Sequence, residues 1–237
     1  MKLFAEYLDS IGQKYEMQVL DSQGDSAKEV DNMRQFAAKA GYNIAKALFD
    51  SMGGSGKIFV VEGLLGNTAN NSRVEGLEKA LAEYPDIEVV AQDTGNWNTD
   101  EALALVETWL TQYPDVGGVW CANDNMATGA LQALDAAGLK GQVGVCGVDA
   151  NTDIVEAIAN GEATATVSSN GYLQGGYTLA ICYAAWTGLL NVEDLPAEYR
   201  EFATPTVLID SPEAAKEWQA YVPDFDFSRP FDCRVAD

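Results

Sequence analysis

The chain has 237 residues, of which 47% are hydrophobic and 10% aromatic, a composition typical of a folded globular protein. Its 14 basic and 36 acidic residues give a formal net charge of −22, which argues against binding to nucleic acid or to an anionic membrane surface. The sequence contains no histidine, which excludes Ser-His-Asp and Cys-His catalysis and every histidine-ligated metal site.

From residue 57 onward, short β-rich runs alternate with segments that have helical spacing. Strands are predicted over residues 57–62, 88–92, 118–121, 143–148 and 163–168. Helices are predicted over residues 70–84, 99–113, 125–137, 152–160 and 172–186. This alternation is typical of an α/β fold, in which a parallel sheet is covered by helices on both faces.

Polar and aromatic side chains follow the carboxyl ends of these predicted strands, where ligands bind in parallel α/β sheets. In strand order they are Arg73, Trp97, Asn123 with Asp124, Asp149, and Ser169. Carboxylates and Arg can bind two neighbouring hydroxyls, amides donate and accept, and an indole packs against the apolar face of a sugar ring. The alternative is that such residues cap helices, which we expect for Asn98 and Thr99.

Four strings carry a resemblance to a known family: residues 62–76 (EGLLGNTANNSRVEG), 119–131 (VWCANDNMATGAL), 145–149 (VCGVD) and 163–169 (ATATVSS). They resemble the ribose-binding-protein-like substrate-binding proteins of sugar ABC transporters, over about residues 1–210. The resemblance implies the type I periplasmic-binding-protein fold, in which two Rossmann-like lobes with parallel sheets close around a sugar. It also implies a protein that is not an enzyme and has no cofactor or metal.

The resemblance assigns roles to the strand-end residues. Arg73 matches a donor to sugar hydroxyls, Trp97 a stacking aromatic, Asn123 a hydrogen-bonding amide, and Asp149 the carboxylate that accepts two hydroxyls. Ser169 stands where the ribose binder has a glutamine, which leaves the identity of the sugar open. Asp124 is expected to be structural and to cap the following helix. The implied partners are a sugar or polyol and an ABC permease, for a monomer in the periplasm or anchored outside the membrane as a lipoprotein.

The amino-terminal part departs from the family pattern. Residues 4–14, 17–23 and 26–36 are predicted as a helix, a strand and a helix, after which the chain passes directly into a helix over 37–49. We assign residues 1–36 and 170–203 to an incomplete amino-terminal lobe, and 37–169 and 204–237 to the sugar-binding lobe. No Gly, Pro or Asn separates the two helices before Gly41, so we expect either a break near residues 36–37 or one long fused helix.

Three other interpretations are weaker. Residues 53–57 (GGSGK) precede a strand and lack the phosphate-loop spacing. A glycosidase pair of Asp124 and Asp149 needs one raised pKa, which the neighbouring amides and Arg73 oppose. A lac-repressor-like regulator shares the fold, but it needs a basic DNA-binding segment.

The cysteines and the start of the chain complete the expectations. Cys121, Cys146, Cys182 and Cys233 form no C-x-x-C pair, and the first three lie in apolar runs, so we expect buried thiols rather than disulfides. No signal peptide is visible at Met1, and we expect that a targeting segment is not part of this chain.

Overall fold

The computed structural model describes residues 26–169, 171–191 and 206–221. The chain divides into two compact units, and each is described by itself. The first comprises Met1–Asn32, Ser169–Val207 and Tyr221–Asp237, and the second comprises Met33–Ser168 and Leu208–Ala220. The predicted helix over 4–14 and strand over 17–23 lie outside the described residues, as does Cys233. The predicted lobe boundaries stay a prediction.

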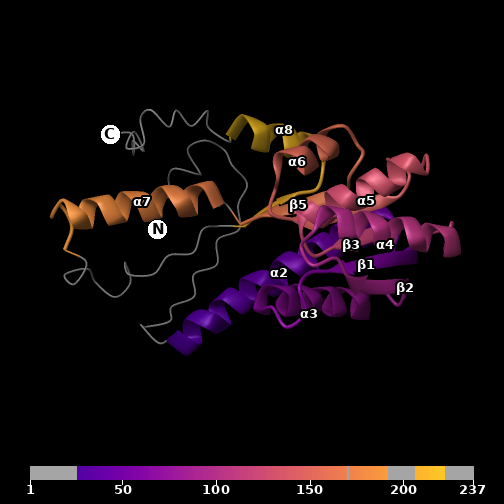
Figure 1. Cartoon of the computed structure of the whole chain (residues 1–237), viewed down its shortest axis with the longest axis horizontal. Coiled ribbons are helices and arrows are strands. Elements are labelled where there is room, and N and C mark those ends of the chain that lie inside the picture. The colour runs from indigo at the N-terminus through magenta and orange to yellow at the C-terminus, as the bar shows by residue number, and fades with distance from the viewer. Residues whose placement is uncertain (1–25, 170, 192–205, 222–237) are drawn as a thin grey trace. The chain divides into compact units, whose positions relative to one another are not determined.

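The second unit alternates strands and helices as the sequence predicts (Figure 1). Its strands are β1 (Ser55–Glu62), β2 (Asp86–Thr94), β3 (Gly118–Cys121), β4 (Gly144–Val148), β5 (Ala165–Ser168) and β6 (Val207–Ile209). Its helices are α2 (Ser26–Ser51), which begins in the first unit, α3 (Thr68–Glu83), α4 (Thr99–Gln112), α5 (Asp124–Ala136), α6 (Thr152–Ala159) and α8 (Pro212–Tyr221). The predicted α/β fold class is confirmed.

The six strands form one sheet in the order β2-β1-β3-β4-β5-β6. Strands β1 to β5 pair in parallel, and the β1–β3 register places Val60 opposite Trp120. The chain steps from β1 to β2 in one direction and then from β3 to β5 in the other. Because parallel crossovers are right-handed, α3 covers one face of the sheet and α4, α5 and α6 cover the other. The direction reverses between β1 and β3, which is where doubly wound sheets bind ligands.

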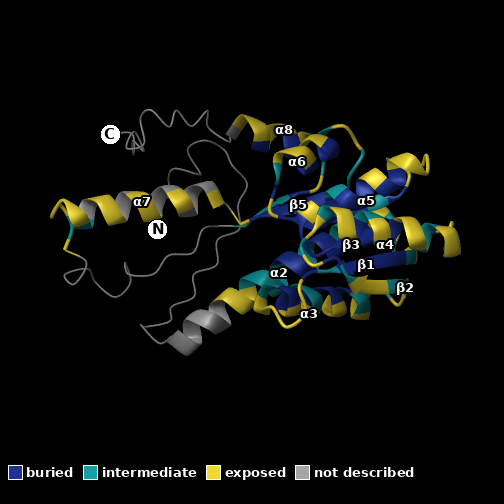
Figure 2. Ribbon diagram, viewed as in Figure 1, coloured by how far each residue is buried: buried dark blue, intermediate teal, exposed yellow. Residues whose placement is uncertain are grey.

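The core lies between the sheet and these two helix layers (Figure 2). All four residues of β3 and all four of β5 are buried, as expected for central parallel strands covered on both faces. Trp120 is the largest fully buried side chain among the described residues, and its indole N–H donates to the Gly41 carbonyl at 3.3 Å. That bond ties the middle of α2 to β3, so the sheet and the α2 layer hold each other in place.

Helix α2 is continuous across residues 36–37, so the second of the two expected outcomes, a single fused helix, is the observed one. Gly41 does not break it, because it serves close packing. A Cβ at Gly41 would overlap the Arg73 carbonyl of α3, and a Cβ at Gly76 would overlap the Ala38 carbonyl of α2. The two glycines therefore bring α2 and α3 into backbone contact.

Helix α7 (Gly171–Trp186) belongs to the first unit and carries exposed apolar side chains, among them Leu179, Tyr183 and Trp186. Cys182 is exposed on the same helix, so the expectation of a buried thiol is wrong there, because the described neighbours Leu179, Tyr183 and Trp186 are also exposed. Cys121 and Cys146 are buried free thiols, as predicted. Among the described residues, no helix is long and apolar enough to cross a membrane.

Candidate functional site

The candidate site lies at the carboxyl ends of β1 and β3, where the order of the sheet reverses. The Ala122 amide donates to the Val61 carbonyl at 2.9 Å, which continues the β1–β3 pairing to the last residues of both strands. The segments that leave these ends are short, and each leads into a helix within a few residues. Side chains that follow the strand ends are thus fixed by regular elements on both sides.

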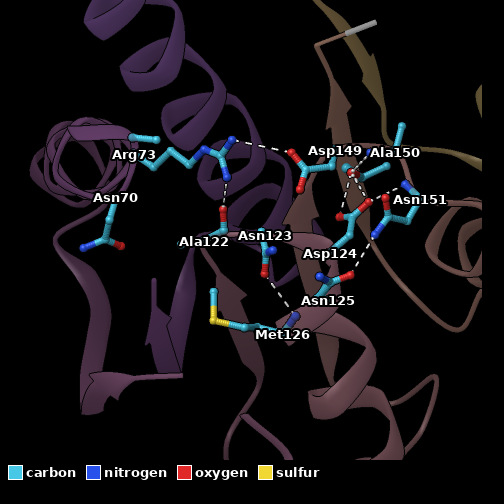
Figure 3. A network of polar contacts seen from close by, with 12 residues as sticks. Asn70, Arg73, Ala122, Asn123, Asp124, Asn125, Met126, Asp149, Ala150 and Asn151 are labelled. Carbon is cyan, nitrogen blue, oxygen red and sulfur yellow. Dashed lines mark hydrogen bonds and ion pairs between the residues drawn. The ribbon is translucent and has the colours of Figure 1, made fainter. Parts of the chain in front are cut away.

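Arg73 projects from α3 across this reversal point (Figure 3). One terminal nitrogen, Nη1, donates to the Ala122 carbonyl at 2.7 Å, and Nη2 lies 3.5 Å from the Asp149 carboxylate. The Arg73 side chain is only 15% exposed. Among the described residues, its Nε is the buried side-chain polar atom that lacks a hydrogen-bond partner. A buried donor without an acceptor is costly, so it marks a place where a ligand oxygen would be stabilising.

Trp97 lies beside Arg73, with its ring centre 5.6 Å from the guanidinium carbon. The indole packs directly on Gly63, where a Cβ would overlap the ring. Gly63 is itself held by buried Asn70 of α3, whose Oδ1 accepts from the Gly63 amide at 2.6 Å. The half-buried ring therefore packs against the Gly63 backbone, and the Arg73 guanidinium lies near its face.

Asp149 follows β4 and faces Arg73, with its side chain 38% exposed. Burial raises the pKa of the Asp149 carboxyl, against the opposing effect of Arg73. Burial also lowers the pKa of Arg73, although Asp149 and Asp124 partly offset the shift. Both shifts have the same cause, since the pair loses more hydration than its 3.5 Å contact restores. Additional hydrogen bonds from a ligand would compensate this loss.

The backbone of the site is strained at its two ends. In the described part of the chain, the non-glycine residues with positive φ are Asn96 (53°), Trp97 (63°), Asp149 (129°) and Ala150 (57°). Such conformations cost about 1–3 kcal/mol each and cluster at functional sites. Here they occur in the two loops that present the stacking aromatic and the carboxylate.

Asn123 follows β3 and is buried, and its Oδ1 accepts from the Met126 amide at 3.1 Å. It therefore caps α5, as Asn98 caps α4. The expectation that Asp124 supplies the α5 cap is wrong. Asp124 is fully buried and accepts instead from the Asn151 amide at 2.7 Å and from the Thr166 hydroxyl at 2.9 Å.

Ser169 is exposed directly after β5 and belongs to the first unit, so it is not placed relative to the other four residues. The structure brings together Arg73, Trp97 and Asp149, with Asn123 at the neighbouring strand end. Sequence reasoning missed Asn70 and Thr166. Neither carries a signal of its own, because an Asn in a helix and a Thr in a strand are ordinary residues in the sequence.

Comparison with protein families identifies the chain. Residues 7–189 match the model of the periplasmic binding protein domain. The chain belongs to the periplasmic binding protein family. The predicted resemblance is thereby confirmed, and so is the predicted type I fold.

Two similar proteins are named as binding proteins for a polyol and for a sugar. The chain is 34% identical over 187 residues to the xylitol-binding protein of Mycolicibacterium smegmatis, which covers 78% of this chain and 52% of that protein. It is 30% identical over 168 residues to the D-allose-binding periplasmic protein of Escherichia coli, a match that covers 69% of this chain and 52% of that protein. The chain thus spans about half the length of the curated relatives it matches.

Solved structures agree in fold. A solute-binding protein of an ABC transporter from Actinobacillus succinogenes, solved with D-allose bound, has a TM-score of 0.66 at 30% identity, covering 90% of this chain and 66% of that one. A twin-arginine translocation pathway signal protein from Burkholderia phytofirmans has a TM-score of 0.73 at 30% identity, and the match covers 83% of this chain and 62% of that one.

The sequence-based expectation that neither Asp124 nor Asp149 has a raised pKa, which argues against a glycosidase, is wrong. Burial raises the pKa of Asp124 to about 7 and also raises that of Asp149, although amides and Arg73 were expected to prevent such shifts. Desolvation exceeds the effect of these neighbours. The conclusion itself is supported independently, because the family and the similar curated proteins are binding proteins.

Proposed function

We propose that this chain is an extracytoplasmic solute-binding protein that captures a neutral sugar or polyol at Arg73, Trp97, Asn123 and Asp149. The observation that carries the proposal is the state of Arg73. Its guanidinium is buried and held between the Ala122 carbonyl, Asp149 and the Trp97 ring, while its Nε has no acceptor. A hydroxyl oxygen that accepts from Nε would complete its bonding.

The charges of the site favour a neutral ligand. Arg73 and Asp149 cancel each other, so a phosphate or carboxylate would meet no unpaired cation. Hydroxyl groups, in contrast, donate to Asp149 and accept from Arg73 at the same time. The Trp97 face supplies apolar area for the C–H side of a ring or a polyol chain. Ser169, which follows β5 and matches a site position by resemblance, is proposed as a further ligand contact.

Binding by closure of the two units is the proposed mechanism, because the chain passes between them several times. A ligand that bridges both units stabilises the closed state by its differential affinity. The similar structure from Actinobacillus succinogenes, an ABC transporter solute-binding protein, supports delivery to an ABC permease. We extend the proposal to a monomer in the periplasm or on a lipid anchor. The net charge of −22 weighs against the regulator alternative.

A thermal-shift panel tests the function. The neutral arm contains xylitol, D-allose, D-ribose and myo-inositol, and the charged arm contains gluconate and ribose 5-phosphate. A ligand at 100 times its dissociation constant should stabilise the protein by about 2.7 kcal/mol. The proposal predicts a shift with at least one neutral compound and none with the charged ones. Shifts confined to the charged arm, or none at all, contradict it.

A further inference from the structure

The Asp149 loop is anchored from beneath by two buried side chains. The Ala150 amide donates to the Thr166 hydroxyl oxygen at 3.2 Å, and the Asn151 amide donates to Asp124 Oδ2 at 2.7 Å. The Thr166 hydroxyl in turn donates to Asp124 Oδ1 at 2.9 Å. Figure 3 shows Asp124 below Ala150 and Asn151, with the Asn151 amide bonded to it. The two amides that follow Asp149 are therefore held by one connected pair of side chains.

The pair and the loop that it holds come from three neighbouring strands. Asp124 follows β3, the loop follows β4, and Thr166 lies within β5. Both side chains are fully buried, so neither can contact a ligand. A Cβ at Gly147 would overlap Asp124 Oδ1, which explains why β4 has a glycine beside the carboxylate.

The loop needs such an anchor because its own backbone is unfavourable. Asp149 and Ala150 have φ values of 129° and 57°, and Asn151 makes no side-chain cap bond to α6. Without Thr166 the Ala150 amide would lose its acceptor inside the protein, which costs more than a hydrogen bond on the surface. Relaxation of the loop toward negative φ would then move the Asp149 carboxylate away from Arg73.

We propose that Thr166 and Asp124 are positioning residues that hold the Asp149 loop in its ligand-binding conformation. The ligand part of this inference rests on the proposed function, whereas the loop geometry does not. Thr166 acts through Ala150, and Asp124 acts through Thr166 and Asn151. Affinity is therefore set partly by two side chains that the ligand never touches.

The test uses the full chain and three threonine variants. Thr166→Val keeps the branched shape and removes the hydroxyl, whereas Thr166→Ser keeps the hydroxyl. Thr164→Val is the matched control. Thr164 Oγ1 also accepts a hydrogen bond from a backbone amide, that of Val145 at 3.2 Å, but Thr164 lies just before the amino-terminal end of β5, away from the Asp149 loop. Affinity is measured by calorimetry with xylitol and D-allose as probes, and amide hydrogen exchange is followed by NMR without ligand.

Thr166→Val should weaken probe binding about tenfold, since a buried amide loses its acceptor. The dissociation constants of Thr166→Ser and Thr164→Val for the same probes should stay within about twofold of that of the parent. In an Asp149→Asn background the further loss from Thr166→Val should nearly vanish, because the anchor acts through Asp149. Losses that multiply in the double variant would overturn the proposal, as would equal affinities for Thr166→Val and Thr164→Val.

Hydrogen exchange separates this inference from the proposed function. The Ala150 and Asn151 amides should exchange faster in Thr166→Val than in Thr164→Val. Equal exchange in the two variants would overturn the positioning role whether or not a probe binds. If the parent binds neither probe in this experiment nor any neutral compound in the thermal-shift panel, the proposed function fails, and the exchange result alone decides the positioning role.

Discussion

Replacing Asp149 with alanine should weaken binding of a neutral sugar or polyol by about a hundredfold. A carboxylate that accepts two hydroxyls makes two charge-assisted hydrogen bonds, each worth about 1.5–3 kcal/mol. The side chain is 38% exposed, so solvent screening places each bond at the lower end of this range. The sum is about 3 kcal/mol, which corresponds to roughly a hundredfold in the dissociation constant. Isothermal titration calorimetry on the parent and the variant measures this loss.

The matched control is Asp115→Ala at the opposite, amino-terminal end of the sheet. Asp115 also pairs with a cation, Lys57, at 2.6 Å, but it follows no strand end of the site. Asp210→Ala removes an exposed carboxylate far along the sequence and serves as a second control. Both controls should change affinity less than about twofold, since surface substitutions away from the site have small effects. Equal losses in Asp149→Ala and Asp115→Ala would refute the site assignment.

Three further predictions concern the same region. Ligand binding should change intrinsic fluorescence, and Trp97→Ala should abolish most of the change; a signal that survives this variant would instead come from Trp109, Trp120, Trp186 or Trp218. Gly63→Ala should displace the Trp97 ring and weaken binding about tenfold, with little effect on binding expected from Gly175→Ala, where no atom lies near the added Cβ. Relative to Asp124→Asn, the parent should lose free energy of unfolding as pH rises from about 4 to about 7, because the folded pKa of Asp124 is raised from 3.8 to about 7 by burial. The free energy of unfolding should change by up to about 1.4 kcal/mol per pH unit for this one proton. Urea titrations at several pH values measure this slope, which should be flatter in Asp124→Asn. An unchanged slope in the variant would show that another group titrates.

Other carboxyls titrate in the same pH range, so the parent is compared with Asp124→Asn. Asp149 and Asp153 also raise the pKa of Asp124, whereas the Asn151 amide and Thr166 lower it. Asp50 and Asp115, on the surface, have pKa values lowered by their lysine partners, so they change stability in the opposite sense. Only the difference between the two proteins isolates the buried carboxyl.

The order of strands and helices could be predicted from the sequence because each element has a strong local signal. The buried run at 118–121 and the Asn98 cap before α4 are examples, and both are found where expected. The sequence permits either a break near residues 36–37 or one helix over residues 26–51. The contact that keeps Gly41 inside a helix is tertiary, because Gly41 packs against α3, and such a contact leaves no local pattern.

The site residues could be predicted by type, but their contacts could not. Strand-end position indicates that Arg73 and Asp149 approach each other, yet the orphaned Nε and the strained φ at Asp149 exist only in the folded chain. The role of Asp124 was mistaken because local sequence favours capping of α5, while the actual bonds reach 27 and 42 residues along the chain. Long-range hydrogen bonds leave no local pattern.

The most direct test of the account is a crystal structure of the full chain with the neutral compound that gives the largest thermal shift. The ligand should lie against the Trp97 ring, with hydroxyl oxygens at hydrogen-bond distance from Arg73 Nε and from the Asp149 carboxylate. A ligand bound elsewhere, such as the hollow lined by Ser51, Lys57 and Thr164 at the amino ends of the strands, would contradict the account.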